Sequence, residues 1–194
     1  MKKTNFTPEE SLLLISKTID ETQERFKAHG GILVFWGVLT VIVFGGQYLL
    51  WSLGLNEYMI YTSYLFPIGA VYTGIHFWKE KKKRNIPKTI ISSVLNMGWI
   101  IGVNLMIMGF FFSDELGEAA GPVFIILFAL MIMVVGLAIR FKPLIIGGLL
   151  TNLIGLSTFW LNGDYYGLSL ILAAIAGMII PGLLLNKTRK RENV

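Results

Sequence analysis

Six stretches of this chain contain no Asp, Glu, Lys or Arg, and each can hold the ~20 apolar residues that a span of a bilayer requires. The segments that flank and connect these stretches alternate between basic and acidic. Residues 1–30, 79–88, 140–142 and 187–194 hold all 17 Lys and Arg residues, whereas the other connecting segments hold none and carry acidic residues. Because basic loops remain on the cytoplasmic side, the pattern predicts six spans with both termini in the cytoplasm. The uncharged stretches are 28–56, 58–78, 89–113, 119–139, 143–163 and 165–186, and the acidic residues opposite are Glu57, Asp114, Glu115, Glu118 and Asp164.

These stretches predict an all-α protein, a bundle of six transmembrane helices in a bacterial plasma membrane. At 194 residues, the spans and their short connections use nearly the whole chain, which leaves no room for a separate soluble domain. We expect a cytosolic amphipathic helix over 1–30, a membrane domain over 31–186 and a basic cytosolic tail over 187–194. The expected spans are 32–53, 59–78, 90–112, 122–139, 144–161 and 165–185.

The first 30 residues contain the signals of an amphipathic helix. Thr7 occupies the N-cap position, Pro8 follows at the first helical position, and Glu10 completes a capping box. The helix is expected to end near His29, and Gly30-Gly31 to break the chain before the first span. Its apolar stripe is narrow and needs a surface to cover it. The stripe consists of Leu12, Ile15, Ile19 and Phe26.

The charge of this helix predicts where it docks. Between residues 8 and 29 it has five acidic residues against three basic ones, a net charge of −2, whereas helices that lie on anionic lipid are rich in Lys and Arg. We therefore expect the helix to fold back under the bundle, with its acidic face toward the basic loop 79–88. A cytosolic protein is the alternative partner for either surface. The acidic residues are Asp20, Glu21 and Glu24, and the basic ones are Lys79, Lys81, Lys82, Lys83 and Arg84.

Two asparagines lie at the same depth in the third and fifth spans. Asn96 follows Pro87 by nine residues and Asn152 follows Pro143 by nine, which at about 1.5 Å per residue places both roughly 13 Å into a hydrocarbon core of about 30 Å. Their side chains either form interhelical hydrogen bonds, worth about 0.6 kcal/mol each, or line a polar pocket for a solute. The other candidates to line such a pocket are Thr40, Gln47, Tyr72, Asn104 and Thr151.

The same proline-to-asparagine spacing suggests an internal repeat. It recurs at a shift of 56 residues, and the same shift back from the third span reaches Gly31 and Thr40, which are also nine apart. This indicates three repeated hairpins, a construction found in many transporters and in other membrane proteins. Chance matching between apolar sequences is the alternative.

Prolines and small residues predict local features of the spans. Pro67 and Pro181 are expected to bend their helices because each removes a backbone donor. Small residues four apart allow backbones to approach closely, either within one bundle or at the face of a homo-oligomer. Such pairs are Ala70 and Gly74, Gly98 and Gly102, and Ala173 and Gly177.

The sequence lacks the residues that membrane enzymes and ion-driven transporters commonly use. It has no Cys, which excludes disulfides, thiolate catalysis and Cys-ligated metal. His29 and His76 have no acidic neighbour in their spans with which to bind a metal. No ionisable Asp, Glu, Lys or Arg lies within a span, although proton relays need one at depth. We predict no catalytic site, no cofactor and no nucleic-acid partner, because membrane topology accounts for the basic residues.

The run from Ser11-Leu12-Leu13-Leu14-Ile15-Ser16-Lys17 through Phe35-Trp36-Gly37 resembles the opening of a group of small uncharacterised bacterial multipass membrane proteins. The resemblance covers about a quarter of the chain. It contains no catalytic or binding motif, so it implies a six-span membrane protein and no particular activity.

Three functions remain open on these observations. The first is a non-enzymatic accessory, sensory or regulatory membrane component that engages a protein partner through the N-terminal helix or the basic loop. The second is a small permease for a neutral or amphipathic solute, with Asn96, Asn152 and Tyr72 along its path. A membrane enzyme is the third. A permease requires a continuous polar cavity at the midplane, whereas a partner-binding protein requires an exposed cytosolic surface.

Overall fold

The computed structural model describes residues 7, 9, 12, 13, 16, 17, 30–83, 97, 100–102, 104, 105, 107, 117–161 and 165–192, without the side chains of 77, 80–83, 118 and 189–192. Every regular element within these residues is a helix. The predicted all-α class is therefore confirmed for the described part of the chain.

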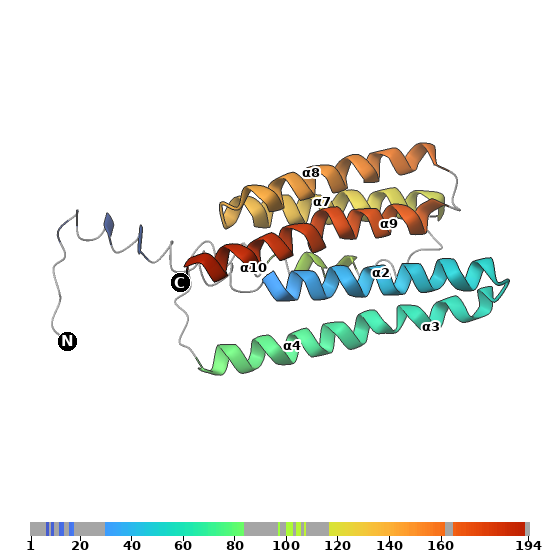
Figure 1. Cartoon of the computed structure of the whole chain (residues 1–194), viewed down its shortest axis with the longest axis horizontal. Coiled ribbons are helices and arrows are strands. Elements are labelled where there is room, and N and C mark those ends of the chain that lie inside the picture. Colours follow the sequence, from blue (N-terminus) through green and yellow to red (C-terminus); the bar gives the residue numbers. More distant parts are fainter. Residues whose placement is uncertain are drawn as a thin grey trace.

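The long helices lie side by side along one common axis (Figure 1). Three of the short elements, η1, η2 and η3, are single 3₁₀ turns, and η5 is a π-helical turn. The elements are α2 (Gly30–Ser52), η1 (Asn56–Tyr58), α3 (Met59–Ser63), α4 (Leu65–Lys83), η2 (Gly117–Ala119), α7 (Ala120–Ala138), α8 (Lys142–Ser157), η3 (Thr158–Trp160), α9 (Tyr166–Ala174), η5 (Ile175–Ile179) and α10 (Ile180–Glu192).

Four described helical segments are long and apolar enough to cross a membrane. They coincide with the first, fourth, fifth and sixth expected spans and cover Gly30–Ser52, Ala120–Ala138, Lys142–Trp160 and Tyr166–Thr188. The second expected span, 59–78, is divided between α3 and α4. Only seven residues of the third, 90–112, are described, and all seven are helical. Four described helical segments thus have the length and composition of membrane spans.

A short left-handed turn joins α7 to α8. Arg140 has a φ of +52°, its amide donates to the carbonyl of Leu137, and the amide of Phe141 donates to the carbonyl of Gly136. These are the two hydrogen bonds of a Schellman cap, which usually has glycine at the left-handed position. Phe141 is buried, so the turn is fixed to the bundle from inside. It holds α7 and α8 antiparallel, as the short connection predicts.

The buried core lies where α7, α8 and the last helix meet near this turn. Branched and long apolar residues fill it, and Trp36 of α2 packs against its edge. The fully or nearly fully buried members are Ile132, Ile139, Phe141, Leu144, Met178 and Leu185.

Gly30 and Gly31 are helical, so the predicted break before the first span is wrong. Gly30 is buried in α2, and a Cβ atom there would lie 2.6 Å from Asn186 Oδ1 and 3.1 Å from Leu185 Cβ of α10. The absence of a side chain at Gly30 therefore allows α10 to cross α2 closely at this point. A Cβ on Gly37, further along α2, would lie 3.2 Å from the backbone nitrogen of Ile179. Both glycines let α2 pack directly on the last helix.

The backbone departs from a regular α-helix near both prolines, while the expected bends stay a prediction. Helix α3 ends at Ser63 and α4 begins at Leu65, so Pro67 lies in the first turn of α4, where its missing donor is tolerated. Pro181 follows the π turn Ile175–Ile179, in which the amide of Ile180 donates to the carbonyl of Ile175. The helical path of the last span is irregular at this point, as the proline predicts.

Two connections differ from the sequence prediction because helices continue into charged residues. The segment expected as a basic loop from Lys79 is still α4 as far as Lys83, and α10 extends through the expected tail to Glu192. Lys residues are good helix formers and favourable near a helix C-terminus. The charged extension also explains why α4 as a whole is less apolar than the four candidate spans.

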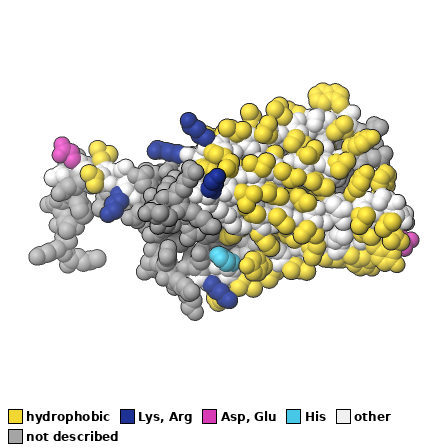
Figure 2. Space-filling view, in the orientation of Figure 1, with side chains coloured by type: hydrophobic (Ala, Val, Ile, Leu, Met, Phe, Trp, Pro, Cys, Tyr) yellow, Lys and Arg dark blue, Asp and Glu magenta, His cyan; other side chains and the backbone are white. Residues whose placement is uncertain are grey.

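Charged side chains lie at the ends of the bundle (Figure 2). Lys79, Arg140, Lys142 and Lys187 are exposed at the end where α4 and α7 finish, and Glu57 is exposed at the opposite end. Hydrophobic side chains cover the face between these ends. The charged side chains of the bundle that the structure describes are therefore segregated as the linear sequence predicts.

Candidate functional site

The described members of the predicted midplane pocket do not form a hydrogen-bonded cluster. Thr40 Oγ1 donates to the carbonyl of Trp36 at 2.9 Å, within its own helix. Asn104 is exposed, and its Nδ2 donates to the carbonyl of Ile100 at 2.9 Å. Asn152 is half-buried on α8, and no hydrogen bond joins its side chain to another described residue. Asn96 lies outside the described residues.

Other polar side chains of the spans show the same preference for backbone carbonyls. Thr73 and Thr158 donate to the carbonyls of Gly69 and Gly155 in their own helices. Such back-bonding satisfies a hydroxyl inside hydrocarbon without a partner helix. Thr151 is the exception, because its Oγ1 reaches both Gly147 O at 2.8 Å and Ala173 O of α9 at 3.3 Å.

Gln47 makes a side-chain to side-chain hydrogen bond between two helices, donating from Nε2 to Ser63 Oγ at 2.9 Å. This bond fixes α2 to α3. It is a structural link of the kind that asparagine and glutamine commonly form between membrane helices.

An aromatic cluster that sequence reasoning did not identify lies between α2 and α4. Phe35 and Tyr72 have ring centroids 5.3 Å apart, and Trp36 is stacked on Phe66 at 6.5 Å with an interplanar angle of 9°. Gly69 lies between them, since a Cβ there would be 3.6 Å from Phe35 and 3.7 Å from Trp36. We call Phe35, Trp36, Phe66 and Tyr72 the aromatic seam.

The seam contains a buried polar atom without a partner. Trp36 Nε1 is buried and, among the described residues, is the one such side-chain nitrogen or oxygen that has no hydrogen bond. Buried indole N–H groups usually find an acceptor. A sequence signal existed in the paired aromatics Phe35-Trp36 and in the Phe66 to Gly69 spacing, but aromatic residues near a membrane interface are too common to single these out.

The small-residue pairs have different outcomes. Ala173 and Gly177 are buried, and a Cβ on Gly177 would lie 2.5 Å from Thr151 Oγ1, so this pair does admit a close neighbour. Gly74 is exposed with nothing within 4 Å of its Cβ position. On α4 the contact to α2 is made by Gly69 instead, where Leu39 Cδ2 is 2.7 Å from the Cβ position.

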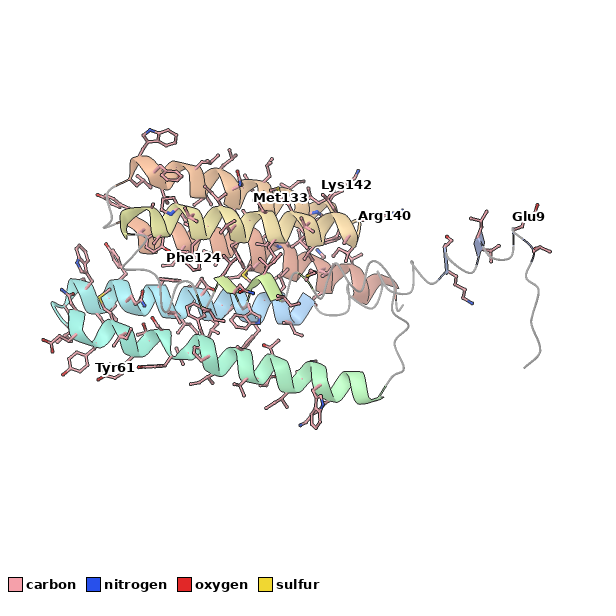
Figure 3. The ribbon with its side chains drawn as sticks, turned by 180° about the vertical axis from the view of Figure 1, so that it is seen from behind. Glu9, Tyr61, Phe124, Met133, Arg140 and Lys142 are labelled. Carbon is pink, nitrogen blue, oxygen red and sulfur yellow. The ribbon has the colours of Figure 1, made fainter. Side chains whose placement is uncertain are left out.

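The basic part of the expected docking surface is described only in part. Lys79 is exposed at the end of α4. The backbone of Lys81, Lys82 and Lys83 is helical, while Arg84 and the acidic residues Asp20, Glu21 and Glu24 lie outside the described residues. Two further cations belong to the same end of the molecule. Figure 3 shows Arg140 and Lys142 at the α7–α8 turn, with Tyr61 at the opposite end.

The apolar stripe of the N-terminal segment does not have the expected cover where it is described. Leu12 is 67% exposed and Leu13 is 72% exposed, and Glu9 lies away from the bundle in Figure 3. Leu12 is thus not covered by the bundle, while Ile15, Ile19 and Phe26 lie outside the described residues, so the predicted docking of the helix stays a prediction. Exposed ion pairs contribute only about 0–1 kcal/mol each, and a single narrow stripe gives little apolar area with which to hold the helix in place.

No cluster of three or more His, Asp or Glu side chains suited to a metal ion occurs within the described part of the chain. Comparison with protein-family models, curated proteins and solved structures gives no match.

Proposed function

We propose that the chain is a six-span protein of the plasma membrane with both termini in the cytoplasm, and that it serves as a non-enzymatic accessory, sensory or regulatory component. In this proposal α3 and α4 supply the second span and residues 90–112 the third. The three hairpins then repeat one construction. The basic end of the bundle faces the cytoplasm, in accord with the positive-inside rule.

One observation carries the proposal of a protein partner. Leu12 and Leu13 belong to helical residues outside the spans, and both are about two-thirds or more exposed, at 67% and 72%. Burying a leucine side chain is worth about 1.5–3 kcal/mol. Exposed leucines on an amphipathic helix are the kind of anchor that enters the groove of another protein.

A small permease for a neutral or amphipathic solute is the second candidate. It would use Asn96, Asn152 and Tyr72 along its path, with Thr40 in the same polar pocket. The hydrogen bonds favour the first proposal, because Thr40 satisfies its hydroxyl within its own helix, and Asn104 likewise donates to its own helix from an exposed position. A solute path needs polar groups that converge and remain available to the solute.

The partner proposal is tested by photo-crosslinking in living cells. A photoreactive amino acid replaces Leu12, and a matched control places it at Trp160, which is 82% exposed at the opposite end. We expect a discrete protein adduct from position 12 and none of the same mass from position 160. Leu13→Asp in the same chain should abolish the adduct. An adduct that persists unchanged with Leu13→Asp would contradict a specific apolar contact.

The permease alternative is tested separately. Because the chain has no Cys, Asn152→Cys and Thr40→Cys each provide a single thiol. Under the proposed function neither thiol reacts with a membrane-impermeant thiol reagent, while a thiol at exposed Lys187 reacts from the cytoplasmic side. Rapid labelling at position 152 that a solute protects would establish a water-filled path and favour the permease.

A further inference from the structure

Two cations flank a buried phenylalanine in the turn between α7 and α8. Phe141 has an extended backbone, with a φ of −110° and a ψ of 98°, and its ring is buried. Successive side chains of an extended backbone point to opposite sides, so the flanking side chains point away from the core. Arg140 and Lys142 are accordingly exposed, and Figure 3 shows both at this end of the bundle. The turn therefore presents two positive charges from one short segment that is anchored from inside.

Arg140 has a backbone conformation that is unfavourable for arginine. Its φ of +52° lies in the left-handed region, where a Cβ atom is strained and where a Schellman cap usually has glycine. Strained residues of this kind cluster at functional sites. Neither Arg140 nor Lys142 forms an ion pair with another described side chain. The described fold therefore gives no structural reason for arginine in place of glycine at this position.

Exposed apolar side chains lead away from Lys142 along α8. Ile146, Leu149 and Leu153 follow Lys142 by four, seven and eleven residues, so all of them share its side of the helix. All three are exposed. From Lys142 to Leu153 this stripe is about 16 Å long, close to half of a hydrocarbon core of about 30 Å. The stripe therefore has the depth of one leaflet of a bilayer.

A second exposed stripe lies beside it on α7. Leu130 and Leu137 are exposed and seven residues apart, so they share one side of the helix. Ile132, two residues from Leu130, instead faces η5 of the last span, as does Gly147, two residues from Leu149 on α8. A separation of two residues is about 200° around a helix axis. The exposed stripes of α7 and α8 therefore lie on the same side of the pair, away from the last span.

We propose that this side of the α7–α8 hairpin binds one anionic phospholipid. The Arg140 guanidinium and the Lys142 ammonium contact its phosphate, and its acyl chains lie on the two apolar stripes. Arginine suits a phosphate because its planar group can donate two parallel hydrogen bonds, and basic residues at the cytoplasmic ends of membrane helices bind anionic lipid headgroups. The stripes favour a lipid over a soluble phosphate, because only a lipid covers them. The site needs no cavity and no movement of a helix, since both cations and both stripes are already exposed.

The test measures lipid binding to the purified full chain in micelles of a neutral detergent by native mass spectrometry. Phosphatidylglycerol and phosphatidylcholine with identical acyl chains are titrated separately. A cation near an anionic surface contributes about fivefold to binding, so the tightest site should prefer phosphatidylglycerol by about thirtyfold. Arg140→Gln and Lys142→Gln should each lower this preference about fivefold, and the double variant should abolish it. Equal affinity of the unaltered chain for the two lipids would overturn the proposal.

Arg140→Gly separates lipid binding from any effect on the fold. Glycine relieves the left-handed strain, so this variant should unfold at a higher temperature in lipid-free detergent and yet lose as much of the lipid preference as Arg140→Gln. Arg140→Lys keeps the positive charge and should keep most of the preference. Full retention of the preference in Arg140→Gly would show that the arginine does not contact the lipid.

Two controls decide whether the site is local and whether it takes a lipid. Lys187→Gln removes an exposed cation of α10 at the same end of the bundle and should leave the preference unchanged. An equal loss with this variant would indicate a diffuse charge effect and contradict the site. Deacylated phosphatidylglycerol should not bind at the concentrations at which the lipid binds, and equal binding would identify a soluble phosphate as the occupant. The inference rests on the proposed membrane location, whereas its test is independent of orientation and of a partner at Leu12, so a negative result would leave the proposed function standing.

Discussion

The backbone carbonyl oxygens of Gly30 and Gly182 each lie 3.0 Å from the position that a Cβ atom on the other residue would occupy. The two glycines therefore form a reciprocal contact at which α2 and α10 approach backbone to backbone. Neither position has room for a side chain unless the helices separate.

Gly182→Ala is expected to lower the free energy of unfolding by about 1–3 kcal/mol, the usual range for overpacking a tight site. The new Cβ would also lie 3.1 Å from the backbone nitrogen of Val34, and backbone atoms cannot rotate away. Gly74→Ala is the matched control, because nothing lies within 4 Å of its Cβ position. The control should be neutral or gain up to about 1 kcal/mol. Unfolding in mixed detergent micelles measures both, and equal stability of the two variants would contradict the close crossing.

Arg140→Gly is expected to raise stability by roughly 0.5–1 kcal/mol. The φ of +52° at Arg140 is unfavourable for a residue with a Cβ by about 1–2 kcal/mol. Glycine avoids this cost, but it raises the conformational entropy of the unfolded chain, which offsets part of the gain in stability. Lys142→Gly, in the first turn of α8, should instead lower stability. The comparison is made by thermal unfolding in one detergent, and a loss of stability in both variants would count against the strained turn.

Thr151→Val is expected to lower stability by about 0.6 kcal/mol, with an upper limit near 1.7 kcal/mol, as measured for hydrogen bonds between membrane helices. The change removes the donor to Ala173 O on the neighbouring helix. Thr73→Val is the control, because the Thr73 hydroxyl donates to Gly69 O within its own helix. A larger loss at position 73 than at 151 would argue that the interhelical bond contributes nothing.

Single thiols introduced into the Cys-free chain are expected to report opposite sides of the membrane. In intact cells a membrane-impermeant maleimide should label Glu57→Cys and spare Lys187→Cys, because the basic end is predicted to face the cytoplasm. Permeabilised cells should label both. Labelling of Lys187→Cys in intact cells would reverse the proposed orientation.

The sequence predicted those features that depend on long apolar runs. Four spans coincide with uncharged stretches because a bilayer requires length and apolar composition and little else. The antiparallel α7–α8 pair follows from a connection too short for any other arrangement. The charges likewise gather at the ends of the described bundle because hydrocarbon excludes them from its middle.

The sequence-based predictions failed where one residue type can have two different structural roles. Gly30 and Gly31 suggested a break, but glycine also permits close helix crossing, and only the position of α10 distinguishes the two roles. Asn104 was a candidate to line the pocket because it is a polar residue within a span, although an amide can bond to a carbonyl of the preceding turn, as it does here. The orphaned indole of Trp36 has no local signature at all, because the absence of a partner is a property of the packed bundle.

The π turn at Ile175–Ile179 gives the last span a particular tolerance to change in chain length. A π-type i→i+5 bond encloses one more residue than an α-helical turn, and here it precedes Pro181. Deleting one residue from this turn restores a regular α-helical turn and keeps the residues beyond it near their present positions. The same deletion in the regular helix α9 would instead rotate every residue beyond it by about 100° around the helix axis. Gly182 would then turn away from Gly30, and Leu185 would leave the core. A single-residue deletion within the π turn should therefore be far less damaging than one in α9.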